Sequence, residues 1–201
     1  MGWDRVMYEF IILSLLMRSP MHGYLIAKIA SDQIGPWAKI SSGTLSTILA
    51  KLERAGLIAQ CAPTTAPQTG RQSRTFSITD TGRIRFHQMM IDTSSNLGEY
   101  QRLFYQKLVF FDLIRLDERL LLWDHYRNYC QTTLLYLQTE AVALRQELAG
   151  EANLTFREHA LRVMTRMEQQ WHAEVVWATE ERAREAEAAG RDAAAFDETA
   201  P

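Results

Sequence analysis

The apolar positions in the N-terminal part of the chain recur with the spacing of helices. Residues 6–17 are apolar on almost every side, which predicts a buried helix, and Ser19-Pro20 ends it because proline cannot continue a helix. A second helix is predicted from about 21 to 34. We expect its inner face to be formed by Tyr24, Leu25, Ile29 and Ala30.

A third segment has the clearest amphipathic pattern, with apolar residues at i, i+3, i+4 and i+7, at Leu45, Ile48, Leu49 and Leu52. Ser41 and Ser42 precede it and are suitable N-cap residues. Gly56 follows it, where a glycine commonly ends a helix. We therefore expect a helix with one apolar face and one polar face.

Two short strands and a long turn follow the third helix. Residues 57–62 and 74–79 have strand character, with Phe76 and Ile78 facing inward, and the segment 63–70 is rich in Pro, Thr, Gln and Gly. Asp80-Thr-Gly82 then begins another helix. The order helix, helix, helix, strand, long turn, strand, helix is that of a winged helix-turn-helix, in which residues 57–79 form the wing.

Beyond residue 83 the pattern is helical throughout, with helices predicted at 80–93, 97–114, 117–149 and 154–188. Two long apolar seams recur at intervals of three and four residues, one at Cys130, Leu134, Leu137, Ala141, Leu144 and Leu148, the other at Ala160, Met164, Met167, Trp171, Val175 and Ala178. One helix cannot bury such a seam alone, so we expect partner helices.

The predicted fold class is therefore mainly α. A winged-helix domain with three helices and a two-stranded wing is expected at 1–92, and an all-helical dimerisation and effector domain at 93–188. Residues 189–201 are acidic and rich in alanine without an apolar seam, which predicts a disordered tail.

Charge separates the two halves of the chain. Residues 1–90 contain ten Lys and Arg against five Asp and Glu, whereas residues 91–201 contain twelve against nineteen. A basic domain joined to an acidic one indicates a polyanion-binding module attached to something else. The alternative is ordinary compositional fluctuation, so the motifs have to decide between them.

Other functional classes lack their signatures. Cys61 and Cys130 form no CxxC pair, and the sequence has no HExxH motif, phosphate loop or paired nucleophile and base, so we expect no metal, no cofactor and no enzymatic activity. The apolar run 10–17 is too short to span a bilayer, and acidic residues precede it where a secretion signal would be basic. A cytoplasmic protein without membrane contact is the expectation.

Double-stranded DNA is the polyanion that a winged helix binds, with the third helix in the major groove and the wing along the backbone. Hydroxyls, helix N-terminal amides and basic side chains suit such contacts. The predicted DNA-binding residues are Lys39, Ser41, Ser42, Gly43, Thr44, Ser46, Thr47 and Lys51 around the third helix, and Arg71, Ser73 and Arg74 in the wing. The alternative for each is a solvated polar surface.

Three segments resemble the PadR family of transcription regulators, in the family's order: Ser19-Pro-Met-His-Gly-Tyr24, then the third helix from Ser42-Gly-Thr-Leu45 to Lys51-Leu-Glu-Arg-Ala-Gly-Leu-Ile58, and Arg74-Thr-Phe-Ser-Ile-Thr79 with Gly70-Arg71 before it. The helical remainder is similar to the family's longer, Vir-type C-terminal domain. Ser46 departs from the family pattern, which usually has a DNA-contacting tyrosine there. The resemblance implies a repressor that a small, often aromatic effector releases from DNA.

A two-fold symmetric dimer would bind two half-sites of a pseudo-palindromic operator. We expect a homodimer whose interface is formed by Leu134, Leu137, Ala160, Met164, Met167, Trp171 and Val175. The competing interpretation is a winged helix that contacts proteins without binding DNA, which the basic wing disfavours. For the tryptophans, simple core packing competes with a role in lining an effector cavity.

Overall fold

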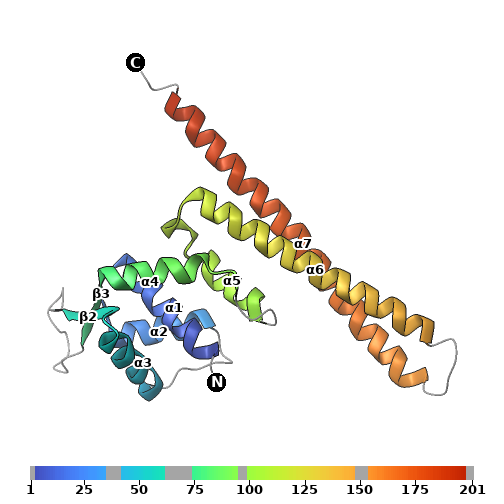
Figure 1. Ribbon diagram of the computed structural model, residues 1–201, viewed down its shortest axis with the longest axis horizontal. Helices are drawn as coiled ribbons and strands as arrows, with labels where there is room; N and C mark the ends of the chain where they lie inside the picture. The colour runs from blue at the N-terminus through green and yellow to red at the C-terminus, as the bar shows by residue number, and fades with distance from the viewer. Residues whose placement is uncertain (1–2, 35–41, 62–73, 95–98, 148–153, 198–201) are drawn as a thin grey trace. The chain divides into compact units, whose positions relative to one another are not determined.

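The computed structural model describes residues 3–34, 42–61, 74–94, 99–147 and 154–197 (Figure 1). The elements in chain order are α1 (Trp3–Arg18), β1 (Met21–His22), α2 (Gly23–Ile34), α3 (Ser42–Arg54), β2 (Ile58–Cys61), β3 (Thr75–Ile78), α4 (Asp80–Ile91), α5 (Tyr100–Leu108), the 3-10 helix η2 (Phe111–Leu113), α6 (Leu116–Glu147) and α7 (Leu154–Asp197). This confirms the predicted mainly helical class. In the part of the chain that the structure describes, no helix is both long and apolar enough to cross a membrane.

The strands form a three-stranded antiparallel sheet in the order β1-β3-β2. The predicted pairing of β2 with β3 is confirmed, and its register runs from Ile58 opposite Ile78 to Cys61 opposite Thr75. The strand β1 is an addition to the prediction, which assigned Met21 and His22 to a helix. Two residues of strand leave no periodicity in a sequence, because only pairing with β3 defines them.

The rotation of α2 differs from the prediction. Its first residue, Gly23, faces α3 and the sheet so closely that a Cβ there would lie 3.4 Å from the Leu49 side chain. This contact turns Ile26 and Ala30 into the core, and both are fully buried. The expected inner face was therefore wrong at Tyr24 and Leu25, whose side chains are exposed.

The core of the winged-helix unit contains a cluster of aromatic rings beside α1. The Phe10 ring lies 6.0 Å from the rings of both Phe86 on α4 and Phe110 after α5. The Phe104 ring packs edge-to-face on Phe111 at 6.0 Å. These contacts hold α5 and η2 in the same compact unit as the winged helix, which ends at Leu113, whereas the sequence predicts a domain boundary after residue 92.

The second unit begins at Ile114 and consists of α6 and α7 packed antiparallel along each other (Figure 1). Its interior is again aromatic: Trp123 packs edge-to-face on Trp177 with ring centroids 5.2 Å apart, and Tyr129 packs on Trp171 at 5.5 Å. The helix α7 continues to Asp197, whereas the sequence predicts disorder from residue 189. Alanine has the highest helix propensity, so an alanine-rich segment can extend an existing helix without a seam.

Candidate DNA-binding surface

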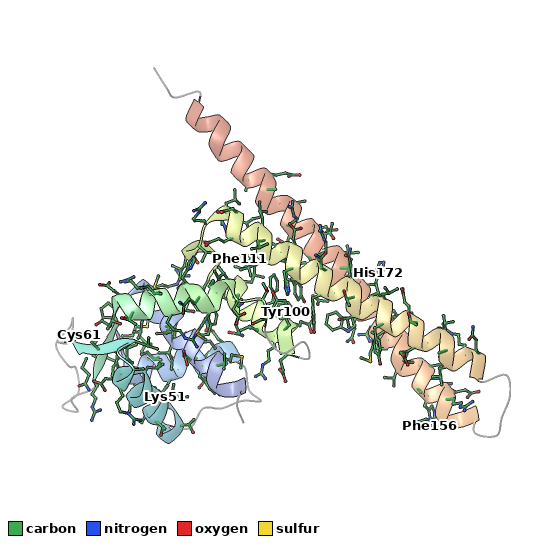
Figure 2. All side chains as sticks on the ribbon, viewed as in Figure 1. Lys51, Cys61, Tyr100, Phe111, Phe156 and His172 are labelled. Atoms are coloured by element: carbon green, nitrogen blue, oxygen red, sulfur yellow. The ribbon has the colours of Figure 1, made fainter. Side chains whose placement is uncertain are left out.

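The helix α3 has the two faces that its sequence predicts. Its four apolar residues are buried, namely Leu45, Ile48, Leu49 and Leu52, and on the other side Gly43, Thr44, Ser46, Thr47, Ala50, Lys51 and Arg54 are exposed. The buried stripe packs on α1, α2 and β2, so it fixes the rotation of the helix about its axis. The small polar side chains are consequently held outward on a rigid element, with Lys51 one turn before its end (Figure 2).

Hydrogen bonds within α3 limit what its exposed side chains can offer a ligand. The Thr47 hydroxyl donates to the Gly43 carbonyl oxygen at 2.9 Å, one turn earlier. A hydroxyl has one proton, so Thr47 can only accept a further hydrogen bond. The Arg54 Nε donates to the Ala50 carbonyl oxygen at 3.2 Å, which holds the guanidinium along the helix end. The Thr47 hydroxyl oxygen can thus accept a hydrogen bond from a donor such as the exocyclic amine of adenine or cytosine.

The charge at the end of α3 is positive on its exposed side. Lys51 and Arg54 are exposed, and the one acid of the helix, Glu53, is half-buried and accepts a hydrogen bond from Gln60 Nε2 on β2 at 2.8 Å. This bond directs the carboxylate toward the sheet. Lysine and arginine on the open side are suitable for a phosphate backbone.

The described part of the wing contributes one predicted DNA-binding residue, Arg74. Its side chain is exposed, and its carbonyl oxygen accepts a hydrogen bond from Gly23 N at 3.1 Å. A second bond between the same segments joins Thr75 Oγ1 to His22 Nδ1 at 2.8 Å. The predicted residues Lys39, Ser41, Arg71 and Ser73 and the side chain of Ser42 lie outside the described residues.

A surface hollow of about 610 Å³ lies between α2, α3 and β3 beside the polar face of α3. Its lining includes Tyr24, Ser46, Ala50 and Arg74. Tyr24 was expected on the inner face of the second helix, although the four-residue spacing of Ile26 and Ala30 defines a buried face that leaves position 24 outside. Ser46, where the resemblance expects a tyrosine, lines the same hollow.

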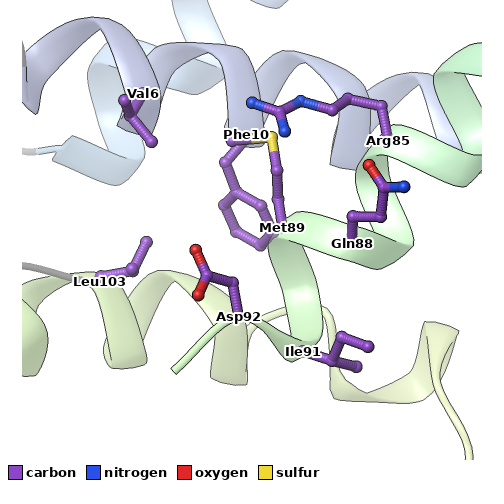
Figure 3. Close-up of a pocket in the computed structure, with 8 residues that line it drawn as sticks. All are labelled: Val6, Phe10, Arg85, Gln88, Met89, Ile91, Asp92 and Leu103. Carbon is purple, nitrogen blue, oxygen red and sulfur yellow. The ribbon is translucent and has the colours of Figure 1, made fainter. Parts of the chain in front are cut away.

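A second cavity, of about 410 Å³, lies in the same unit between α1, α4 and α5 (Figure 3). Val6, Phe10, Met89 and Leu103 give it apolar walls, and the polar residues Arg85, Gln88 and Asp92 also line it. The Arg85 Nε donates to Glu9 Oε1 at 2.9 Å, which ties α4 to α1. No sequence motif marks this cavity, because its walls come from three separate helices.

A buried lysine joins α4 to α5 close to this cavity. Lys107 is fully buried, and its Nζ donates to the carbonyl oxygen of Asp92 at the end of α4. Burial disfavours the charged ammonium and lowers the pKa of Lys107 to about 8, and the nearby Asp92 carboxylate only partly opposes this. Hydrogen bonds from Ser94 lower the pKa of the Asp92 carboxyl, so the acid stays ionised beside the lysine.

The predicted dimer residues are divided between the interior and the surface of the α6–α7 pair. Leu137 is buried, Met167 is exposed, and the other five, Leu134, Ala160, Met164, Trp171 and Val175, are half-buried. Hydrogen-bonded pairs join the two helices beyond or at the edge of these positions: Tyr126 donates to Glu174 at 2.7 Å, and Arg182 binds Asp124 through two nitrogens at 2.9 and 3.0 Å. The burial of Leu137 and the packing of Trp171 on Tyr129 show that part of the predicted seam is used within one chain.

Large apolar side chains remain exposed on the same two helices. On α6, Leu135 (64% exposed) and Val142 are seven residues apart, and on α7 Phe156 (69% exposed) and Val163 are also seven apart. A spacing of seven places each pair on one face of its helix. Because the helices are antiparallel, both pairs lie in the same half of the unit.

Among the described residues, no group of three or more His, Cys, Asp or Glu is arranged to hold a metal ion. Burial raises the pKa of the Cys130 thiol to about 12, so at neutral pH it is a protonated core residue.

The comparisons with known proteins concern both parts of the chain. Residues 12–88 match the sequence model of the family described as the transcriptional regulator PadR-like family. None of the curated proteins compared with the chain matches it significantly. Among solved structures, the chain is similar to Bacillus subtilis PadR in complex with operator DNA, at 19% identity and a TM-score of 0.37, covering 88% of this chain and 98% of that chain.

Two further solved structures are similar to the chain. One is Bacillus subtilis PadR in complex with p-coumaric acid, at 18% identity and a TM-score of 0.36, covering 89% of this chain and 98% of that chain. The other is a transcriptional regulator from Clostridium thermocellum, at 28% identity and a TM-score of 0.37, covering 44% of this chain and 83% of that chain. The matched residues 12–88 extend from α1 into α4 and contain α3 and the sheet. Over these residues, which are less than half of the chain, the protein is similar to the PadR-like family of transcriptional regulators.

Proposed function

We propose that this chain is a transcription repressor that binds a pseudo-palindromic operator as a homodimer and leaves it when a small effector binds. The observation that carries the proposal is the rigid α3, with a buried apolar stripe beneath an outward row of Thr44, Ser46, Thr47 and Lys51. A helix of this kind in a winged helix can enter the major groove while Arg74 and the wing contact the backbone. As a regulator that acts on DNA, the protein would work in the cytoplasm.

Salt dependence separates DNA binding from a role in protein contact alone. Each phosphate contact by a basic side chain should lower log K by about 0.9 per unit of log salt on duplex DNA. We expect Arg74→Ala to weaken binding to random and operator duplexes alike and to flatten that slope. The matched control is Arg102→Ala on α5, another arginine of this unit. A wild-type chain that binds no duplex at low salt would favour the protein-contact interpretation.

We assign dimerisation to the α6–α7 pair, in the role of the Vir-type C-terminal domain. The exposed Leu135, Val142, Phe156 and Val163 support a face that a second copy of the chain covers, together with Met167 and the half-buried Met164 and Ala160. Burying one large apolar side chain contributes about 1.5–3 kcal/mol. Four such side chains from each partner would favour association, and two linked winged helices would bind two half-sites more tightly than either alone.

We place the effector in the cavity between α1, α4 and α5. Its volume of about 410 Å³ is that of a small-molecule site, which spans roughly 300–1,000 Å³ in proteins. Phe10 and Met89 offer apolar walls to an aromatic ring, and Arg85 and Gln88 offer hydrogen-bond donors to its polar group. An occupant would press on α1 and α4, the helices that support α3 and the sheet. This would shift the position of α3 relative to the DNA.

p-Coumaric acid is a suitable first probe of the cavity, measured by calorimetry and by release of bound operator DNA. Val6→Trp should abolish both signals, because Val6 lines the cavity from a half-exposed position that a larger ring can fill without entering the core. Ile84→Trp is the control, since Ile84 is exposed on α4 and is not among the residues that line the cavity. Equal release from wild type and Val6→Trp would place the effector elsewhere.

A further inference from the structure

Tyr24 is the most exposed of the large apolar and aromatic side chains in the described structure, at 77%. An exposed leucine or tyrosine needs no explanation by itself, but the backbone beside this tyrosine is held by its neighbours. Gly23 donates a backbone hydrogen bond to the Arg74 carbonyl oxygen, and a Cβ at position 23 would lie 3.4 Å from the Leu49 side chain. The next residue, Tyr24, lies on the exposed side of α2.

The ring of Tyr24 projects beside the polar face of α3. It lines the hollow of about 610 Å³ together with Ser46 and Ala50 of α3 and with Arg74. Lys28 lies one helical turn after Tyr24 and is exposed, so it shares that side of α2. Glu53 also lines the hollow, but its carboxylate is bonded to Gln60.

Two residues that line the hollow suit an anion as its occupant. Arg74 brings positive charge, and the Tyr24 phenol can donate a hydrogen bond to an oxygen of the anion. Lys28 does not line the hollow, but its exposed side chain adds positive charge on the same side of α2. Tyrosine and arginine both contact phosphate oxygens in protein–DNA complexes, and such contacts set the register of the protein on the duplex. The hollow also adjoins the face of α3 that would meet the bases.

We propose that Tyr24 and Arg74 together hold one phosphate of the DNA backbone in this hollow and thereby fix how α3 lies in the major groove. This inference rests on the proposed DNA-binding function. The tyrosine contributes a neutral hydrogen bond, and the arginine contributes charge. The contact is independent of base sequence, so Tyr24 is a positioning residue for α3.

The experiment compares Tyr24→Phe, which removes only the hydroxyl, with wild type on a random duplex and on an operator obtained by binding-site selection. We expect affinity to fall about tenfold on both, which is typical of one lost hydrogen bond to a charged group. The salt slope should stay unchanged in Tyr24→Phe and become flatter in Arg74→Ala. Tyr136→Phe, at another exposed tyrosine, on α6, is the control and should bind as wild type does.

Duplexes with single neutral methylphosphonates locate the contact. One substitution in each half-site should weaken wild type more than it weakens Tyr24→Phe, because the variant no longer makes that contact. Unchanged affinity of Tyr24→Phe for both duplexes would overturn the inference and leave DNA binding intact, and so would a loss confined to the operator. A wild type that binds neither duplex would overturn the proposed function and this inference with it.

Discussion

The backbone of Gly82 lies directly against the carbonyl group of Leu57, so that a Cβ at position 82 would be 2.0 Å from the Leu57 oxygen. The same carbonyl accepts a hydrogen bond from Thr79 N at 3.1 Å, and the Thr79 hydroxyl in turn accepts one from Gly82 N at 3.0 Å. This close approach joins the start of α4 to the exit from α3. It therefore supports the orientation of the proposed recognition helix.

We expect Gly82→Ala to lower the free energy of unfolding by about 3 kcal/mol, near the upper end of the cost of inserting one methyl group into a packed site. Backbone, which cannot swing aside, blocks the new Cβ. Denaturant unfolding measures the change. Gly56→Ala is the matched control: Gly56 has a φ of 69° but open space around it, so only the left-handed strain of about 1–2 kcal/mol applies. Equal costs at the two positions would contradict the close packing of α4 on Leu57.

Thr47 should influence base preference more than general affinity. Its hydroxyl proton is committed to Gly43, so its oxygen can only accept from a base amine. Thr47→Val keeps the shape and removes the acceptor. We expect binding-site selection to return a motif relaxed at one position in each half-site, with a discrimination loss of about 1 kcal/mol. The same selected motif from Thr47→Val and wild type would show that Thr47 reads no base.

Phe156→Asp and Val163→Asp should dissociate the proposed homodimer without unfolding the helix pair. Both side chains are exposed within one chain, and an acid at position 156, in the first turn of α7, is favourable for the helix dipole. Sedimentation at micromolar concentration should show monomers, while circular dichroism stays unchanged. Val176→Asp is the control, because it is exposed roughly on the opposite side of α7. Persistent dimers of both variants would place the interface elsewhere.

Trp171→Asp should act differently, although Trp171 is the most obvious aromatic of the α7 seam. Its ring packs edge-to-face on Tyr129 of the same chain, so a charge there disrupts the helix pair itself. We expect a loss of thermal stability together with the loss of dimer. A fully folded monomer from Trp171→Asp would show that this ring serves the interface alone.

Lys107 gives the winged-helix unit a distinctive pH dependence. Its pKa is lowered from 10.5 to about 8 in the folded chain, so between these values the unfolded chain binds more protons than the folded one. The free energy of unfolding should therefore rise with pH across this window, at up to about 1.4 kcal/mol per pH unit. Lys107→Met removes this group, and the difference between the two proteins in denaturant unfolding isolates its effect. A difference that stays constant from pH 7 to 10 would refute the shift.

The sequence alone determined the elements whose signals are local. The stripe from Leu45 to Leu52 defined the rotation of α3, and Gly56 marked its end with the positive φ that the structure shows. These features depend on the helical repeat and on backbone sterics, which act within a few residues. The order of elements, and with it the winged helix, followed from the same signals.

Only the tertiary structure decided how the elements are rotated and which surfaces stay open. The contact of Gly23 with Leu49 and Phe76 turned Tyr24 out of the core, and the two residues of β1 exist only through their pairing with β3. In the second unit, an apolar seam has the same sequence pattern whether a helix of its own chain or a second copy of the chain covers it. Packing of Trp171 on Tyr129 used part of that seam within one chain and left Phe156 and Val163 exposed, because burial depends on neighbours distant in sequence.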